Sequence, residues 1–208
     1  MSLSLSNIIL TTLNARYIHS AFGLRYLYAN LGELQAQALI KEFTIHERPI
    51  DIAEKLLELE PKIIGFSVYI WNITGITETV TLLKQIAPEV VIVLGGPEVS
   101  HLPDKPDVVD IADYVVTGAG EVSFKKLCEQ VLNKLKPLNK VIEGEAETLD
   151  KLTMPYEFYN DEDIRNRLIY VEASRGCPFK CEFCLSSLDK TSKPFELGAF
   201  LNEMDKLQ

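Results

Sequence analysis

The sequence has few cysteines, no long hydrophobic run and no excess of basic residues. Three of its four cysteines lie in one short stretch and the fourth is Cys128, so they pair poorly as a disulfide framework, and no secretory signal opens the chain. No apolar run approaches the length of a membrane span. The net charge of −9 argues against broad nucleic-acid binding, which needs surplus Lys and Arg. We therefore predict a cytoplasmic protein that binds small molecules, without a membrane or nucleic-acid partner; its oligomeric state stays open.

The chain is long enough, at 208 residues and 47% hydrophobic content, for one domain with a real core plus a piece of another. Short β-branched runs alternate with helical patterns, which indicates βαβ units and a parallel sheet. Cys128 lies within one helical pattern, and we interpret it as a small buried hydrophobe. The sequence predicts a doubly wound, Rossmann-like or flavodoxin-like α/β domain over residues 1–140, with five parallel strands at 7–13, 42–46, 62–68, 90–94 and 114–117.

Polar residues and glycines follow the predicted strands. Open parallel sheets bind ligands outside the carboxyl ends of their strands. Glycines there let a ligand approach the backbone closely, although glycine after a strand also serves as ordinary turn chemistry. Ser67 and Thr117 can supply hydroxyl hydrogen bonds. The predicted cofactor-binding residues are Asn14, His19, Ser67, Val68, Tyr69, Gly95, Gly96, Pro97, Glu98, Thr117, Gly118, Gly120 and Glu121.

Three cysteines near the end of the chain, Cys177, Cys181 and Cys184, have the spacing C-x3-C-x2-C. A four-iron cluster usually has four protein ligands, so three thiolates leave one iron for a small molecule. Phe183 between the last two would cover the cluster with an apolar ring. A structural zinc site needs four Cys or His ligands, which this region does not supply. We therefore predict an iron-sulfur site.

These segments resemble a known family. The cysteine loop is similar to the CxxxCx(aromatic)C loop of the radical S-adenosylmethionine (SAM) superfamily, which holds a [4Fe-4S] cluster and SAM. The GGPEVS segment at 95–100, the TGAGE segment at 117–121 and the loop at 13–20 resemble the cobalamin-binding domain that precedes the barrel in one large subfamily. The resemblance implies cobalamin in the strand-end pocket. Arg175 would counter the charge of the cluster or of SAM, or be a solvated loop arginine.

The lower ligand of the cobalt is a point of departure from other cobalamin domains. Those of the mutase and methionine synthase type carry Asp-x-His-x-x-Gly, and none of His19, His46 and His101 has Asp two residues earlier. We therefore expect the dimethylbenzimidazole tail of cobalamin to lie extended in the pocket. Tyr69 and Trp71 would cover the lower face of the cobalt, or pack as ordinary aromatics beneath the neighbouring helix.

The resemblance also sets the expected organisation. Residues 141–167 would be an interdomain connector and 168–208 the start of a radical SAM barrel, with a strand at 168–173 and a helix at 194–207. We expect an amino-terminal fragment without turnover of its own.

In the full-length parent, an electron donor would reduce the cluster, and SAM would be cleaved to a 5′-deoxyadenosyl radical, most simply for methylation of an unactivated carbon. Alternatives are a cyclase of the magnesium-protoporphyrin monomethyl ester type, or a flavodoxin-like nucleotide-binding module without radical chemistry. A signalling receiver domain would need an acidic cluster after the first strand, which is absent.

Overall fold

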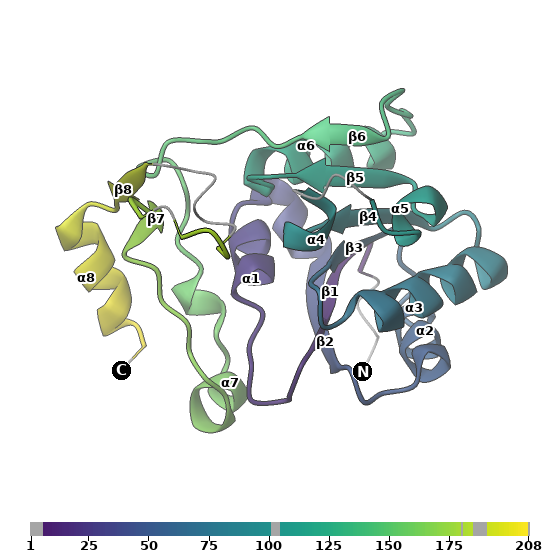
Figure 1. Ribbon diagram of the computed structural model, residues 1–208, viewed down its shortest axis with the longest axis horizontal. Helices are drawn as coiled ribbons and strands as arrows, with labels where there is room; N and C mark the ends of the chain where they lie inside the picture. Colours follow the sequence, from purple (N-terminus) through teal and green to yellow (C-terminus); the bar gives the residue numbers. More distant parts are fainter. Residues whose placement is uncertain (1–5, 101–104, 180, 185–190, 208) are drawn as a thin grey trace.

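A computed structural model describes residues 6–100, 105–179, 181–184 and 191–207. Its centre is a six-stranded parallel sheet with strand order β2-β1-β3-β4-β5-β6 (Figure 1). This order extends the flavodoxin-like arrangement 2-1-3-4-5 by one strand and places the reversal of strand order between β1 and β3. The strands are β1 (Ile8–Asn14), β2 (Ala38–Thr44), β3 (Ile63–Ser67), β4 (Val91–Gly95), β5 (Tyr114–Thr117) and β6 (Val141–Glu143).

Helices cover both faces of the sheet, so the predicted doubly wound fold is confirmed. On one face, α2 (Pro49–Leu57), α3 (Ile73–Ile86) and α5 (Val108–Ile111) share a buried core with alternate residues of the strands. On the other, α1 (Phe22–Ala29) and α6 (Glu121–Leu132) build a second core that contains Cys128. Two shorter helices, η1 (Gly32–Gln37) and α4 (Pro97–Ser100), complete the connections. The apolar runs of the central strands fit this arrangement, because such strands are buried on both faces.

Two features of the sheet differ from the sequence prediction. The second strand begins at Ala38 rather than at residue 42, because β1 pairs with it along its whole length, from Ile8 opposite Ala38 to Asn14 opposite Thr44. Val141–Glu143, which the sequence placed in the connector, forms β6. Both are edge strands that, apart from the buried Phe43, alternate between exposed and half-buried positions, so their apolar signal is weak.

The region after the sheet contains η2 (Tyr156–Phe158), α7 (Asp161–Asn166), β7 (Ser174–Gly176), β8 (Ser192–Pro194) and α8 (Leu197–Asp205). Figure 1 shows β7, β8 and α8 beside the sheet. β7 and β8 pair antiparallel. Helix α8 begins three residues later than predicted, because the Glu196 side chain caps it by accepting hydrogen bonds from the backbone N–H groups of Gly198 and Ala199.

The predicted strand at 168–173 is wrong. Leu168 makes only an isolated bridge to His19, and tyrosine hydroxyls replace a neighbouring strand as hydrogen-bond partners. The Tyr159 hydroxyl donates to the carbonyl of Tyr170 at 3.0 Å and accepts from its N–H at 3.2 Å. The Tyr156 hydroxyl donates to the carbonyl of Glu172 at 3.2 Å and accepts from its N–H at 3.0 Å. The backbone polar groups of Tyr170 and Glu172 are therefore satisfied without a neighbouring strand.

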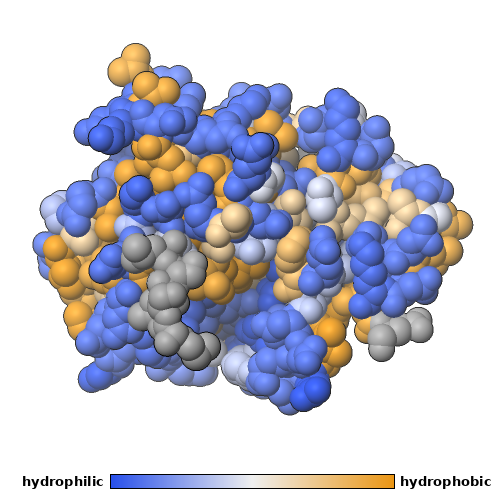
Figure 2. Space-filling view, turned by 180° about the vertical axis from the view of Figure 1, so that it is seen from behind, coloured by the Kyte–Doolittle hydropathy of each residue, from blue (hydrophilic) through white to orange (hydrophobic). Residues whose placement is uncertain are grey.

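The surface agrees with the composition. Hydrophilic side chains cover most of the face seen in Figure 2, with apolar patches between them. Within the described ranges, no helix combines the length and apolar character that crossing a membrane requires.

Candidate cofactor pocket at the carboxyl edge of the sheet

A cavity of about 330 Å³ lies at the carboxyl ends of β3, β4 and β5, between helices α1 and α6. Gly65 in β3 and Val93 in β4 lie on this face of the sheet. The absence of a side chain at Gly65 leaves room, since an added Cβ would come within 3.0 Å of the Phe124 ring. The side walls come from Phe22, Gly23, Tyr26 and Leu27 on α1, and from Glu121 and Phe124 on α6.

Glycines bring the backbone to the rim of this pocket. Gly96 has φ +103°, and a Cβ there would lie 2.5 Å from the carbonyl oxygen of Val68. Gly118 has φ +67° with nothing within 4 Å of an added Cβ. An added Cβ at Gly23 would meet only the Tyr69 hydroxyl, at 3.9 Å. Gly118 and Gly23 therefore border open space, whereas Gly96 allows two loops to touch.

Tyr26 places a polar atom in the otherwise apolar wall. Its side chain is buried, and its hydroxyl finds no partner of hydrogen-bonding geometry among the described residues. Burial, reinforced by the nearby Glu172 carboxylate, raises the pKa of Tyr26. The hydroxyl therefore stays protonated and can donate to a ligand.

Charge in the pocket is concentrated at Arg175 and two carboxylates. Arg175 Nη2 lies 2.7 Å from Glu121 Oε1, its Nε lies 3.1 Å from Glu172 Oε2, and its guanidinium carbon is 4.4 Å from the centre of the Tyr26 ring. Burial alone would lower the pKa of Arg175, but Glu121 and Glu172 outweigh it and raise the pKa. Arg175 is thus a paired cation in the pocket wall rather than a solvated loop residue. The two carboxylates leave this part of the pocket with a net negative charge.

The structure gathers about half of the predicted cofactor residues around this cavity. Val68 is buried and supports the rim instead, because its N–H donates to the carbonyl of Gly95 at 2.8 Å. The Thr117 hydroxyl faces β6, where it donates to the carbonyl of Ile142 at 3.5 Å. Pro97 and Glu98 begin α4 outside the lining. The predicted residues that line the cavity are Ser67, Tyr69, Gly95, Gly96, Gly118, Gly120 and Glu121.

Sequence reasoning missed the contribution of α1 and of the segment before the cysteine loop. The sequence prediction did not single out Tyr26, and it assigned Glu172 to a strand. Gly23 was the available signal, because a glycine within a helix costs stability and therefore indicates close approach or open space.

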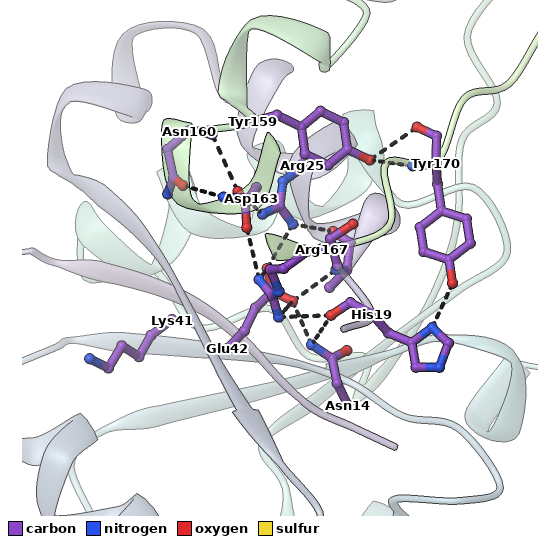
Figure 3. A network of polar contacts seen from close by, with 12 residues as sticks. Asn14, His19, Arg25, Lys41, Glu42, Tyr159, Asn160, Asp163, Arg167 and Tyr170 are labelled. Carbon is purple, nitrogen blue, oxygen red and sulfur yellow. Dashed lines mark hydrogen bonds and ion pairs between the residues drawn. The ribbon is translucent and has the colours of Figure 1, made fainter. Parts of the chain in front are cut away.

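Asn14 and His19 lie in a separate polar network (Figure 3). Asn14 Nδ2 donates to Glu42 Oε2 at 2.6 Å and to the carbonyl of His19 at 2.9 Å. His19 Nδ1 lies 2.6 Å from the Tyr170 hydroxyl. His19 therefore joins the loop after β1 to the segment that leads to β7, and Asn14 ties that loop to β2. Neither of these predicted site residues is among those that line the cavity.

The centre of this network is a buried set of two arginines and two carboxylates. Arg25 lies 2.7 Å from Glu42 and 2.6 Å from Asp163. Arg167 lies 2.9 Å from Asp163 and 3.1 Å from Glu42. All four side chains are less than 10% exposed. Buried charges require such mutual pairing, so the network holds α7 against α1 and β2.

Aromatic side chains continue beyond the rim. The rings of Tyr69 and Trp71 stack with centroids 4.4 Å apart and an angle of 9° between their planes. Trp71 is half exposed, with 50% of its surface accessible. The pair therefore packs on itself and keeps a free apolar area at the end of β3.

The cysteines of the loop are accessible, in contrast to Cys128. Cys181 is exposed, Cys177 and Cys184 are partly buried, and no disulfide joins cysteines in the part of the chain that the structure describes. Among these residues, no group of three His, Cys, Asp or Glu side chains is placed to hold a metal. The assignment of Cys177, Cys181 and Cys184 as metal ligands stays a prediction. Burial raises the pKa of the Cys128 thiol, as expected for a core residue. His101 lies outside the described residues.

Comparison with known proteins gives several relatives. The chain is 27% identical over 154 residues to the cobalamin-dependent radical SAM methyltransferase TokK of Streptomyces tokunonensis, covering 61% of this chain and 22% of that protein. It is 27% identical over 186 residues to an uncharacterized methyltransferase of Pyrococcus horikoshii, covering 80% and 40%. It is 28% identical over 159 residues to the anaerobic magnesium-protoporphyrin IX monomethyl ester cyclase of Rubrivivax gelatinosus, covering 64% and 28%. The chain thus spans well under half the length of these relatives.

A solved structure, that of a novel cobalamin-binding protein from Desulfitobacterium hafniense DCB-2, is similar with a TM-score of 0.44 and 20% identity, covering 59% of this chain and 57% of that one. The family model of the B12 binding domain matches residues 8–128. These residues include β1 to β5 and most of α6, and hence all of the pocket except Glu172 and Arg175. The chain belongs to the B12-binding domain family, whose ligand is cobalamin.

Proposed function

We propose that the chain is the cobalamin-binding part of a radical SAM enzyme and that the cavity between α1 and α6 receives the dimethylbenzimidazole end of the cofactor. The observation that carries this proposal is the position of a glycine-bordered, largely apolar cavity at the carboxyl edge of the sheet, within the matched family domain. Open α/β sheets bind nucleotides at this edge.

The residues present fit such a tail. Phe22, Val93 and Phe124 offer apolar contact to an aromatic base, and the protonated Tyr26 hydroxyl, for which the described residues supply no partner of hydrogen-bonding geometry, can donate to the ligand. A cavity of about 330 Å³ accommodates a base with its sugar but not a whole corrin. The corrin would then lie outside the rim, where Tyr69 and Trp71 present their stacked rings.

Charge argues against a flavin mononucleotide module. In phosphate-binding α/β domains the first helix N-terminus takes the phosphate. Here the Ala21 N–H, at the start of α1, donates to Glu42 Oε2 at 2.8 Å, so a carboxylate already lies at this end. The start of α6 likewise carries Glu121. A phosphate at either position would face a negative side chain.

The chemistry of the whole protein would rest on three cofactors: a [4Fe-4S] cluster, SAM and cobalamin. Cys177, Cys181 and Cys184 would hold three irons of a [4Fe-4S] cluster, leaving the fourth for SAM. When bound and reduced by an electron donor, these groups supply a carbon radical, and cobalamin supplies a methyl group. Methylation of an unactivated carbon would use all three, and two of the relatives are named as methyltransferases. A cyclase reaction is the second candidate, because another relative is named as one.

The proposed cobalamin site is tested by titrating the chain with hydroxocobalamin and recording absorption spectra. We expect binding with a base-off spectrum. Gly23→Leu should weaken binding by about tenfold or more, because the new side chain extends into the cavity. The helix should tolerate the change, since leucine is a better helix former than glycine.

Glu54→Leu, on the exposed side of α2 and on the opposite face of the sheet, is the matched control and should bind like the wild type. If Gly23→Leu and Glu54→Leu bind hydroxocobalamin with equal affinity, this cavity is not the cobalamin site. Saturable binding of flavin mononucleotide in place of hydroxocobalamin would support the nucleotide-module alternative.

A further inference from the structure

Arg175 belongs to two parts of the molecule at once. Its side chain is part of the cavity wall, where it pairs with Glu121 at the start of α6. Its backbone lies in β7, opposite Lys193 of β8, and two residues before Cys177. It therefore connects the cysteine loop directly to the wall of the pocket.

The chain leading to Arg175 is fixed along its length. Arg167 enters the buried network with Asp163 and Glu42, and the Tyr159 and Tyr156 hydroxyls hold the backbone of Tyr170 and Glu172. The segment between the network and β7 is thus held at three successive points. The first is Glu42 of the sheet, and the other two are Tyr159 and Tyr156, which precede the segment in the chain and lie against Arg25 and Phe22 of α1. Arg175 makes the fourth contact and the last before the cysteines.

The partners of Arg175 exclude a simpler role as a counter-charge for the cluster. Glu121 and Glu172 together carry more negative charge than the guanidinium carries positive charge. Its side chain is 26% exposed and rests on the ring of Tyr26. Arg175 thus holds β7 against the start of α6 and against the ring of Tyr26, and we call this set of contacts the fastening.

We propose that Arg175 is a positioning residue that fastens the cysteine loop to the cofactor pocket and so links occupancy of the pocket to the position of the loop. The second half of this inference rests on the proposed cobalamin site. Such linkage is reciprocal: a ligand that packs against the Arg175 wall stabilises the fastening, and the fastening favours the ligand.

The test is hydrogen exchange of the backbone amides in a peptide covering residues 170–179, measured without ligand and with hydroxocobalamin. Without ligand, Arg175→Ala should speed exchange in this peptide by about tenfold, because charge-assisted hydrogen bonds hold the segment closed. Glu121→Gln keeps the shape and removes one charge, so it should act in the same direction. Arg165→Ala, which removes an exposed arginine whose ion pair with Asp161 is long, at 3.9 Å, is the control.

A charge reversal separates positioning from a general loss of stability. Arg175→Glu alone should speed exchange, and Arg175→Glu combined with Glu121→Arg should restore slow exchange. Peptides from β1 and β3 should be unchanged throughout. Wild-type exchange rates in Arg175→Ala, or no rescue by the double variant, would overturn the fastening.

The ligand arm tests the link to the pocket. Hydroxocobalamin should slow exchange of the 170–179 peptide in the wild type and not in Arg175→Ala at saturating ligand. Equal slowing in both proteins would overturn the link. If the wild type fails to bind hydroxocobalamin, the proposed cobalamin site fails together with the link, while the comparison without ligand still decides on the fastening.

Discussion

Gly96 and Gly118 both have positive φ at the rim of the pocket, but their surroundings differ. Gly96 lies against the backbone of Val68, and Gly118 borders open space. The sequence predicted both as site residues from their position after strands. It did not distinguish a glycine that two loops need from one that borders a cavity, because this depends on a contact between residues of different strands.

At this scale we predict that Gly96→Ala is much more destabilising than Gly118→Ala. The alanine Cβ at residue 96 would overlap the Val68 carbonyl, and φ +103° is unfavourable for any L side chain, so the loss should exceed about 3 kcal/mol. Gly118 lies in the left-handed region with free space, where alanine costs about 1–2 kcal/mol. Urea unfolding of both variants measures the difference. Equal losses of unfolding free energy in the two variants would contradict this prediction and would show that the loop at Gly96 moves to make room for the alanine Cβ.

Helix α7 shows how an element can be fixed by groups far away in the sequence. Asn160 and Asp163 form a capping box at its start, and the Asp163 carboxylate also reaches Arg25, 138 residues earlier in the chain. The capping residues are visible in the sequence, but the pairing with Arg25 is not. Only the fold brings α1, β2 and α7 to one buried cluster.

We predict an acid-sensitive contribution from Asp163. Burial alone would raise its pKa, but hydrogen bonds from Arg167 and Arg25 outweigh burial and hold the pKa below its usual value of about 3.9. Because the folded pKa is lowered, this stabilisation is present above the unfolded pKa and is lost as pH falls through the folded one. The free energy of unfolding should therefore decline below about pH 4 to 5.

Asp163→Asn should be less stable than the wild type at pH 7, and its stability should fall less on acidification. Urea unfolding at pH 7, 5, 4 and 3 measures this, because the loss takes place mainly below the unfolded pKa of about 3.9. Asp51→Asn is the control, since the pKa of Asp51 is also lowered, by its hydrogen bond with Arg48, but the side chain lies at the surface. A wild-type and an Asp163→Asn curve that run parallel across this range would contradict the assignment.

At the scale of the whole molecule, the two kinds of candidate site lie in different regions. The proposed cobalamin pocket belongs to the doubly wound sheet, and the cysteines follow β7 beside it. Cys128 lies in the core of the sheet domain, and the other three lie in the loop. Metal and cobalamin binding should therefore be separable by mutation.

We predict that Cys177→Ser, Cys181→Ser or Cys184→Ser strongly reduces iron and sulfide incorporation during anaerobic reconstitution, because a three-thiolate set has no spare ligand. Cys128→Ser should incorporate iron like the wild type. All four variants should keep wild-type affinity for hydroxocobalamin. Iron content and absorption near the cluster bands provide the measurement, and unchanged iron in the three loop variants would refute the ligand assignment.

The sequence alone determined the parallel α/β class, four of the strand positions, the glycine-rich strand ends and the spacing of the cysteines. These are local patterns, written in residues that are close in the chain. Only the tertiary structure decided that α1 forms one wall of the pocket and Arg175 part of another, and that residues 168–173 bond to tyrosine hydroxyls instead of forming a strand. It also decided the pairing of Arg25 with Asp163. Such contacts join residues separated by up to about 150 positions, so no local pattern encodes them.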